Sequence, residues 1–165
     1  RGSLSVRVLC EMRSSSLPQQ MECDLVGKRR FCIWRETFEL DEKYDPVRGI
    51  GKGAYGIVCS AKDRTTQQRV AIKKIKKPFG NKTEAIRCLR EVNLLRHITH
   101  ENIIQIRGIM KPADYENFND VYVVYEFMDT DLHKIIRSGQ PLSDDHHKFL
   151  IMQACHSYVT QIQKV

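Results

Sequence analysis

The chain of 165 residues is long enough for one domain with a hydrophobic core and a tail, because a chain of this size buries most of its unfolded surface. Its formal net charge of +7 favours anionic partners, but the basic residues are spread along the chain, and the spacings of zinc fingers, homeodomains and ribonucleoprotein sheets are absent. We therefore expect no nucleic-acid partner, and we expect no membrane partner because no apolar run approaches the ~20 residues of a membrane-spanning helix.

The six cysteines are scattered and never form a C-x-x-C pair, which argues against a zinc ribbon and against a disulfide scaffold. A reducing compartment fits this usage, so we expect a cytoplasmic protein, with the nucleus as a second location. His146, His147 and His156 lack the spacing of metal ligands, and no metal site is predicted.

Residues 1–36 are rich in Ser and Arg and show no sustained apolar period. This composition predicts a disordered basic tail that contributes little to stability, with a transit peptide as the alternative.

Three glycines follow at the spacing G-x-G-x-x-G: Gly51, Gly53 and Gly56. A dinucleotide-binding loop, the mark of a Rossmann-type oxidoreductase, would need a helix directly after the third glycine. The phosphate loop G-x-x-x-x-G-K-[ST] is absent because Ile57, rather than Lys, follows Gly56.

The residues after the glycines predict a β-hairpin instead of a helix. Residues 57–62 and 70–75 alternate with a period of two, and a polar turn at 63–68 separates them. The glycines then lie at the bend between two antiparallel strands, where backbone N–H groups can approach phosphate oxygens without interference from a Cβ atom. A flexible hairpin tip is the alternative interpretation.

The segment Val70-Ala71-Ile72-Lys73, one strand after the glycines and Val58, matches the lysine strand of protein kinases. Ala71 and Lys73 are two residues apart and project from one face, where a small side chain can cover a flat base while the ammonium reaches its phosphates. Lys74 projects from the opposite face. A surface lysine is the alternative for Lys73.

Helix formers dominate residues 83–98, with Asn81 or Thr83 as the N-cap and Glu84 in the first turn. The apolar positions of this helix fall on one broad arc: Ala85, Cys88, Leu89, Val92, Leu95 and Ile98.

Glu91 lies on the same arc, between Leu95 and Ile98. A lone carboxylate on a buried face is costly unless a cation accompanies it. We expect Lys73 from the sheet to be this cation, with Arg87, one helical turn earlier, as the alternative.

Together these segments resemble the N-terminal lobe of a mitogen-activated protein kinase over residues 38–153. The matching segments are YDPVRGIGKGAYGIVCSA, VAIKKI, LREVNLLRHITHENII and DVYVVYEFMDTDLHKIIRS. The resemblance implies an α+β fold, the kinase small lobe of a five-stranded antiparallel sheet with one main helix, over residues 38–128. Residues 129–153 would begin an incomplete large lobe, and residues 154–165 would form a divergent tail.

The resemblance also implies that the chain binds ATP. The residues that would do so are Ile50, Gly51, Lys52, Gly53, Ala54, Tyr55, Gly56, Ile57, Val58, Ala71, Lys73, Tyr125, Glu126, Met128 and Asp131. In the family, Tyr125 would be the gatekeeper, the backbone of Glu126 and Met128 would hydrogen-bond adenine, and Asp131 would contact the ribose. For Asp131, capping of the helix that follows is the alternative.

The family's activity is serine/threonine phosphorylation in a signalling cascade, with Lys73 and Glu91 as catalytic residues. Protein substrates, an upstream mitogen-activated protein kinase kinase and Mg²⁺ are the implied partners and metal. The His-Arg-Asp and Asp-Phe-Gly segments that supply the base and the metal ligands do not occur in these 165 residues. The Phe-Gly pair at Phe79 and Gly80 is preceded by Pro78 rather than by Asp, so it does not form the Asp-Phe-Gly motif.

The sequence departs from the family's continuation after Gln153, so we expect a chain truncated before the catalytic loop. We expect an ATP-binding portion that is not catalytic by itself, with a non-catalytic regulatory or binding fragment as the alternative. Ser143 is expected to cap a helix in which residues 149–152 leave apolar surface in water.

Overall fold

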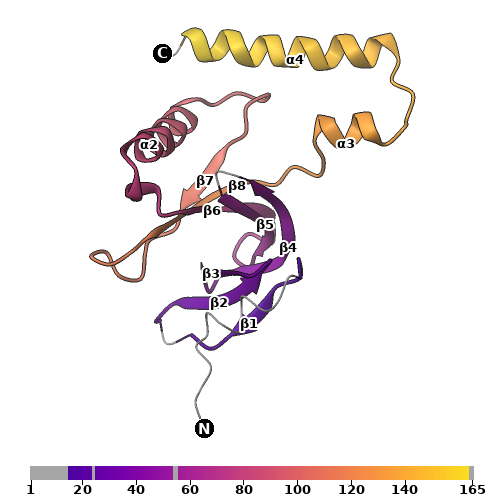
Figure 1. Ribbon diagram of the computed structural model, residues 1–165. Coiled ribbons are helices and arrows are strands. Elements are labelled where there is room, and N and C mark those ends of the chain that lie inside the picture. The colour runs from indigo at the N-terminus through magenta and orange to yellow at the C-terminus, as the bar shows by residue number, and fades with distance from the viewer. Residues whose placement is uncertain (1–14, 24, 54–55, 164–165) are drawn as a thin grey trace.

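The computed structural model describes residues 15–23, 25–53 and 56–163, with side chains described as far as residue 160. In these ranges, six strands come first, a 3-10 turn and a helix follow them, and two further strands precede the last two helices (Figure 1). The strands are β1 (Gln19–Met21), β2 (Lys28–Ile33), β3 (Glu36–Asp41), β4 (Tyr44–Gly53), β5 (Gly56–Asp63), β6 (Arg69–Lys76), β7 (Ile106–Ile109) and β8 (Asp120–Glu126). The helices are the 3-10 turn η1 (Pro78–Gly80), α2 (Lys82–His97), α3 (Leu132–Arg137) and α4 (Asp144–Gln163).

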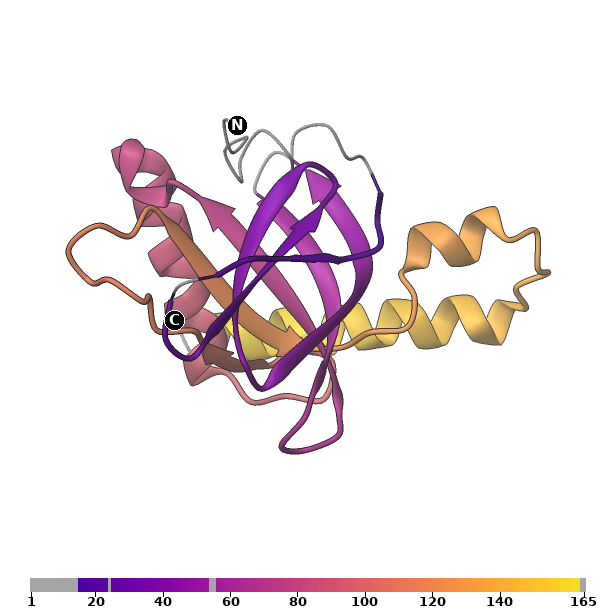
Figure 2. The same ribbon diagram turned by 90° about the horizontal axis from the view of Figure 1, so that it is seen from below.

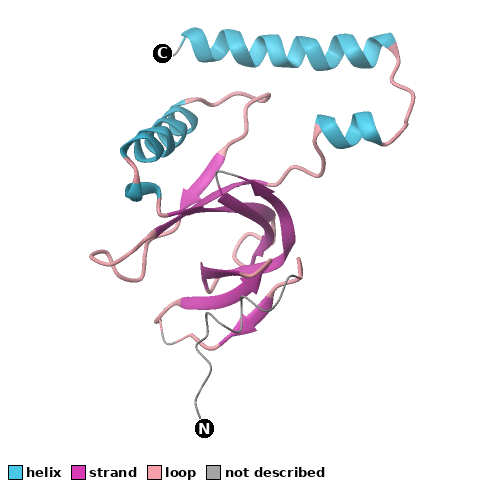
Figure 3. Ribbon diagram, viewed as in Figure 1, coloured by secondary structure: helices cyan, strands magenta, loops and turns pink. Residues whose placement is uncertain are grey.

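A five-stranded antiparallel sheet in the order β4-β5-β6-β8-β7 forms the centre of the molecule, with α2 beside it (Figure 3). The predicted hairpin is present as β5 and β6, whose register pairs Cys59 with Ile72 and Val58 with Lys73. This sheet, its one main helix and the two helices after it confirm the predicted fold class.

A second antiparallel sheet, in the order β1-β2-β3, precedes the first. The expectation of a disordered tail over residues 1–36 is therefore wrong for β1 and β2, and residues 1–14 lie outside the described part of the chain. The physical reason is burial: Phe31 is nearly inaccessible and Ile33 is fully buried. Their apolar surface supplies a driving force that the polar composition of the segment concealed.

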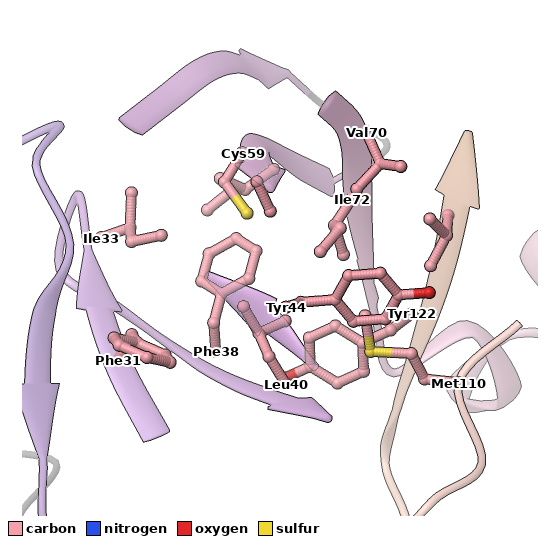
Figure 4. Packing of buried hydrophobic residues seen from close by; sticks show 13 residues of the cluster. Phe31, Ile33, Phe38, Leu40, Tyr44, Cys59, Val70, Ile72, Met110 and Tyr122 are labelled. Carbon is pink, nitrogen blue, oxygen red and sulfur yellow. The ribbon is translucent and has the colours of Figure 1, made fainter. Parts of the chain in front are cut away.

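The main hydrophobic core lies between the two sheets. Figure 2 shows their strands curving around a shared interior, and Figure 4 shows the side chains that fill it. Phe38 and Leu40 of β3 are fully buried there against residues of the larger sheet. The cluster comprises Phe31, Ile33, Phe38, Leu40, Tyr44, Ile57, Cys59, Ala61, Val70, Ile72, Met110, Tyr122 and Val124.

The cysteines differ from one another in environment. Cys32 is disulfide-bonded, which the scattered spacing did not predict, whereas the described cysteines Cys23, Cys59, Cys88 and Cys155 are free thiols. Burial raises the pKa of the Cys59 thiol to about 12, so this core cysteine stays protonated at neutral pH.

Helix α2 begins one residue before the predicted start and ends at His97. Asn81 caps it, because its side-chain oxygen accepts a hydrogen bond from the backbone N–H of Thr83 at 2.8 Å. The predicted apolar arc is too wide: Leu89 is 63% exposed, since α2 meets the sheet along a narrow stripe of half-buried residues that includes Cys88 and Val92.

Helix α4 runs without interruption from Asp144 to Gln163. Ser143 precedes it, and its hydroxyl accepts a hydrogen bond from the backbone N–H of His146. In Figure 1, α4 lies beyond α2 and α3, on the side of the larger sheet away from β1. Within the described ranges, no helix is long and apolar enough to cross a membrane.

The apolar residues of α4 contribute little to the fold, because Phe149 is 55% exposed and Ile151 is 64% exposed. Replacing both with Ser is expected to change the stability of the sheet by less than about 0.5 kcal/mol. Hydrogen exchange in β4 to β8 should keep its protection, whereas Ile72→Ser, in the buried core, should abolish it. Loss of protection in the double variant would show instead that α4 packs on the small lobe.

Asp45 stabilises the fold in a pH-dependent way. Its carboxylate accepts hydrogen bonds from Arg64 Nη2 at 2.8 Å and from Arg29 Nη2 at 2.6 Å. The hydrogen bond from Arg64 has the largest effect and lowers the pKa of Asp45. Burial opposes it, and the hydrogen bond from Arg29 lowers the pKa further, so that the pKa falls from 3.8 to about 2. A carboxyl whose pKa is lowered by folding stabilises the protein above its unfolded pKa, and this contribution is lost as the pH falls from 3.8 to about 2.

Asp45→Asn is therefore expected to lower the free energy of unfolding at pH 7 by up to about 1 kcal/mol, since the pair is partly exposed. The difference from the wild type should vanish near pH 2. Urea unfolding at several pH values measures it, with Asp129→Asn as the control because Asp129 contacts Arg69 only loosely, at 3.4 Å. A difference that persists unchanged at pH 2 would contradict the electrostatic explanation.

Candidate nucleotide-binding site

The three glycines lie where the ends of β4 and β5 meet. Gly53 pairs with Gly56, and Gly51 pairs with Val58. Gly56 has φ +132°, and a Cβ atom there would lie 2.2 Å from the carbonyl oxygen of Lys74, so only glycine fits this position. The predicted site residues Ala54 and Tyr55 lie outside the described residues.

Lys73 of β6 reaches Glu91 of α2. Its Nζ atom donates to Glu91 Oε1 at 2.8 Å and to Oε2 at 2.9 Å. Arg87, the alternative partner of Glu91, instead contacts Glu84 at 3.2 Å. The structure thus brings together the lysine and the glutamate that were expected to pair.

Lys74 projects from the other face of β6, as the alternation predicts. It is nearly buried, and its ammonium contacts the carbonyl oxygen of Thr37 and, at 2.9 Å, Asp120 Oδ2. The rings of Phe38 and Tyr122 lie 5.9 Å from its Nζ atom. Lys74 is therefore a structural cation of the core between the sheets, while Lys73 faces the glycine strands and α2.

Four predicted nucleotide-binding residues share one apolar cluster on the Lys73 face. Ile50 and Val58 come from the glycine strands, and they pack against the cluster that contains Ala71 and Tyr125. Ile57 lies elsewhere: its side chain is buried in the core between the two sheets, so only its backbone borders the glycine bend.

Tyr125 makes a contact that the sequence reasoning missed. Its hydroxyl donates a hydrogen bond to Glu91 Oε1 at 2.7 Å. Strand register could have revealed this contact, because Tyr125 pairs with Ala71 and therefore lies on the same face of the sheet as Lys73. Finding it required the knowledge that β8 lies beside β6.

The carboxyl of Glu91 is held in its charged form. Burial raises its pKa, but the hydrogen bonds from Lys73 and Tyr125 outweigh burial, and the net effect is a pKa below the usual value. Burial, followed by donation to Glu91, raises the pKa of the Tyr125 hydroxyl, which stays protonated. The site thus contains a carboxylate held in its charged form and a hydroxyl that donates to it.

The end of β8 leads away from the sheet toward α3. The backbone N–H of Glu126 donates to the carbonyl oxygen of Gln105 at 3.0 Å, so a contact of Glu126 with adenine would have to use its carbonyl. Met128 is exposed, and Asp131 caps α3 by accepting from the backbone N–H of Lys134 at 2.8 Å. Capping was the alternative role for Asp131.

A cavity of about 260 Å³ opens beside the ion pair and is lined by Lys73, Ile75, Glu84, Arg87, Cys88 and Glu91. In the described part of the chain, no group of three His, Cys, Asp or Glu side chains is arranged to hold a metal ion.

The family model described as "Protein kinase domain" matches residues 44–161, so the chain belongs to this family. It is similar to mitogen-activated protein kinase 7 of Arabidopsis thaliana and to mitogen-activated protein kinase 4 of Oryza sativa subsp. japonica, each 54% identical over 127 residues. Mitogen-activated protein kinase homolog 1 of Petunia hybrida is 52% identical over the same length.

These similarities cover 77% of this chain and 33–34% of each relative. The chain thus spans about a third of the length of the curated relatives it matches. The resemblance to mitogen-activated protein kinases seen in the glycine loop, the lysine strand and the helix is confirmed.

Proposed function

We propose that this chain is the ATP-binding portion of a mitogen-activated protein kinase. The observation that supports it best is the pair formed by Lys73 and Glu91 next to the glycine strands. Backbone N–H groups at Gly51 and Gly53 approach the phosphates, and Ala71 and Val58 lie against the base. The backbone of Glu126, at the end of β8, and of Met128, two residues later, supplies the polar groups that select adenine.

Members of the proposed family transfer the γ-phosphate of ATP to serine or threonine of a protein substrate, after activation by an upstream kinase. Such transfer needs an aspartate to accept the proton and ligands for Mg²⁺. The 165 residues contain neither His-Arg-Asp nor Asp-Phe-Gly. We infer that these residues bind ATP and do not transfer phosphate by themselves.

Two measurements on the 165-residue chain test the proposal. Equilibrium titration with a non-hydrolysable ATP analogue should show saturable binding at one site per chain. Incubation with radiolabelled ATP and a generic basic protein should show no transfer above a heat-denatured control. Absence of saturable binding would overturn the nucleotide site, and transfer would overturn the inference that the chain is not catalytic.

Lys73→Met is expected to weaken binding of the ATP analogue about tenfold, because an ammonium–phosphate hydrogen bond is lost. Lys74→Met should leave the affinity of the folded protein unchanged but lower its stability, since Lys74 is buried and bonded to Asp120. Calorimetric titration measures both variants. Equal losses of affinity would contradict the assignment of the two lysines to opposite faces.

A further inference from the structure

One carboxylate joins three elements of the small lobe. Glu91 of α2 accepts hydrogen bonds from Lys73 of β6 through both of its oxygens. Its Oε1 atom also accepts a hydrogen bond from the hydroxyl of Tyr125 on β8. The position of this carboxylate is therefore fixed from two neighbouring strands of the sheet at once.

The attachment of α2 to the sheet depends strongly on these polar contacts. None of the residues of α2 is fully buried, and Val92 and Leu95 are only half-buried against the sheet. Since a helix gains its stability in a protein mainly from an apolar face packed on a neighbour, a shallow face gives more weight to each directed hydrogen bond.

The Tyr125 hydroxyl is well placed to orient the carboxylate. The ring of Tyr125 is nearly inaccessible and packs in the apolar cluster with Ala71 and Val123, so its hydroxyl has little freedom to move. A bond between a neutral donor and a carboxylate is charge-assisted and stronger than a neutral one. It reaches Oε1 from β8, while Lys73 donates to both oxygens from β6.

We propose that Tyr125 is a positioning residue, whose hydroxyl fixes the Glu91 carboxylate and thereby orients the Lys73 ammonium for the phosphates of ATP. The inference rests on the proposed nucleotide site and adds a residue to it that acts through Glu91. In the absence of the hydroxyl, Lys73 is the one partner that the carboxylate keeps among the described residues, and α2 loses a hydrogen bond to β8.

A titration of Glu91 reports on this bond. The polar groups that face its carboxyl or share its cavity are Lys73 of β6, Tyr125 of β8, and Glu84, Arg87 and Cys88 of α2 itself. Since the hydroxyl bonds to the charged form, its removal should raise the pKa of the Glu91 carboxyl. Removal of a merely structural tyrosine would leave that pKa unchanged.

Tyr125→Phe removes the hydroxyl and keeps the ring, and Tyr122→Phe is its matched control. Tyr122 lies on the same strand and is also buried, but its hydroxyl accepts from the backbone N–H of Glu39 in the other core. In the ligand-free protein, ¹³C NMR follows the titration of the Glu91 carboxyl, and hydrogen exchange follows α2. Titration with a non-hydrolysable ATP analogue then gives the affinity.

In Tyr125→Phe, the Glu91 titration midpoint should move to higher pH, α2 should exchange faster, and the affinity for the analogue should fall about fivefold. Tyr122→Phe should show none of these changes in the folded protein. An unchanged Glu91 titration in Tyr125→Phe would overturn the inference, whatever its affinity.

The proposed function can fail separately. If the wild type does not bind the analogue while Tyr125→Phe still shifts the Glu91 titration, the nucleotide site is wrong and the positioning of Glu91 by Tyr125 stands.

Discussion

Replacing Gly56 with Ala is expected to lower the free energy of unfolding by about 3 kcal/mol or more and to abolish most binding of an ATP analogue. Gly56 has φ +132°, a conformation that residues with a Cβ atom avoid, and the added methyl group would lie 2.2 Å from the carbonyl oxygen of Lys74. Because that obstacle is backbone, a change of rotamer cannot relieve it, and the start of β5 must move away from β6.

Gly53→Ala is the matched control for this change. Gly53 pairs with Gly56 across the same bend, but nothing lies within 4 Å of a Cβ atom built there. Urea unfolding and calorimetric titration of both variants should show a much smaller loss at Gly53. If Gly56→Ala were as stable as Gly53→Ala, the described backbone of the glycine bend would be incorrect.

Ile33→Ala is the second change with a large expected effect. Ile33 of β2 is fully buried in the core between the two sheets, and truncation of such a side chain costs about 2–5 kcal/mol. Val26, seven residues earlier and 99% exposed, provides the control, because Val26→Ala should change stability by less than about 0.5 kcal/mol.

Chemical unfolding followed by circular dichroism measures both variants. The result bears on the organisation of the domain: a large loss at Ile33 means that the first sheet is part of the cooperative unit of the small lobe. A loss at Ile33 as small as that at Val26 would support the disordered tail that composition suggested.

Local patterns carried much of the prediction. The hairpin of β5 and β6 was predictable because the residues on both sides of a polar turn alternate with a period of two in the sequence, and this alternation also separates Lys73 from Lys74. The pairing of Lys73 with Glu91 followed from a single physical argument, that a carboxylate on an apolar helix face needs a cation.

The features that were missed depend on context that local patterns do not contain. The hairpin of β2 and β3 turns at Trp34 and Arg35, whose φ values are 50° and 65°, yet neither residue is the Asn or Gly that usually marks such a turn. The bond from Tyr125 to Glu91 required the strand order, which brings β8 beside β6 across a long connection.

The most direct test of the nucleotide site is a map of backbone amide chemical shifts on addition of a non-hydrolysable ATP analogue. The account predicts large, saturable changes at Gly51, Val58 and Lys73 of the larger sheet and at Met128, just after β8. It predicts small changes at Lys28, next to Asp41 in the first sheet. Changes confined to the first sheet, or saturable binding that leaves the glycine strands unaffected, would contradict it.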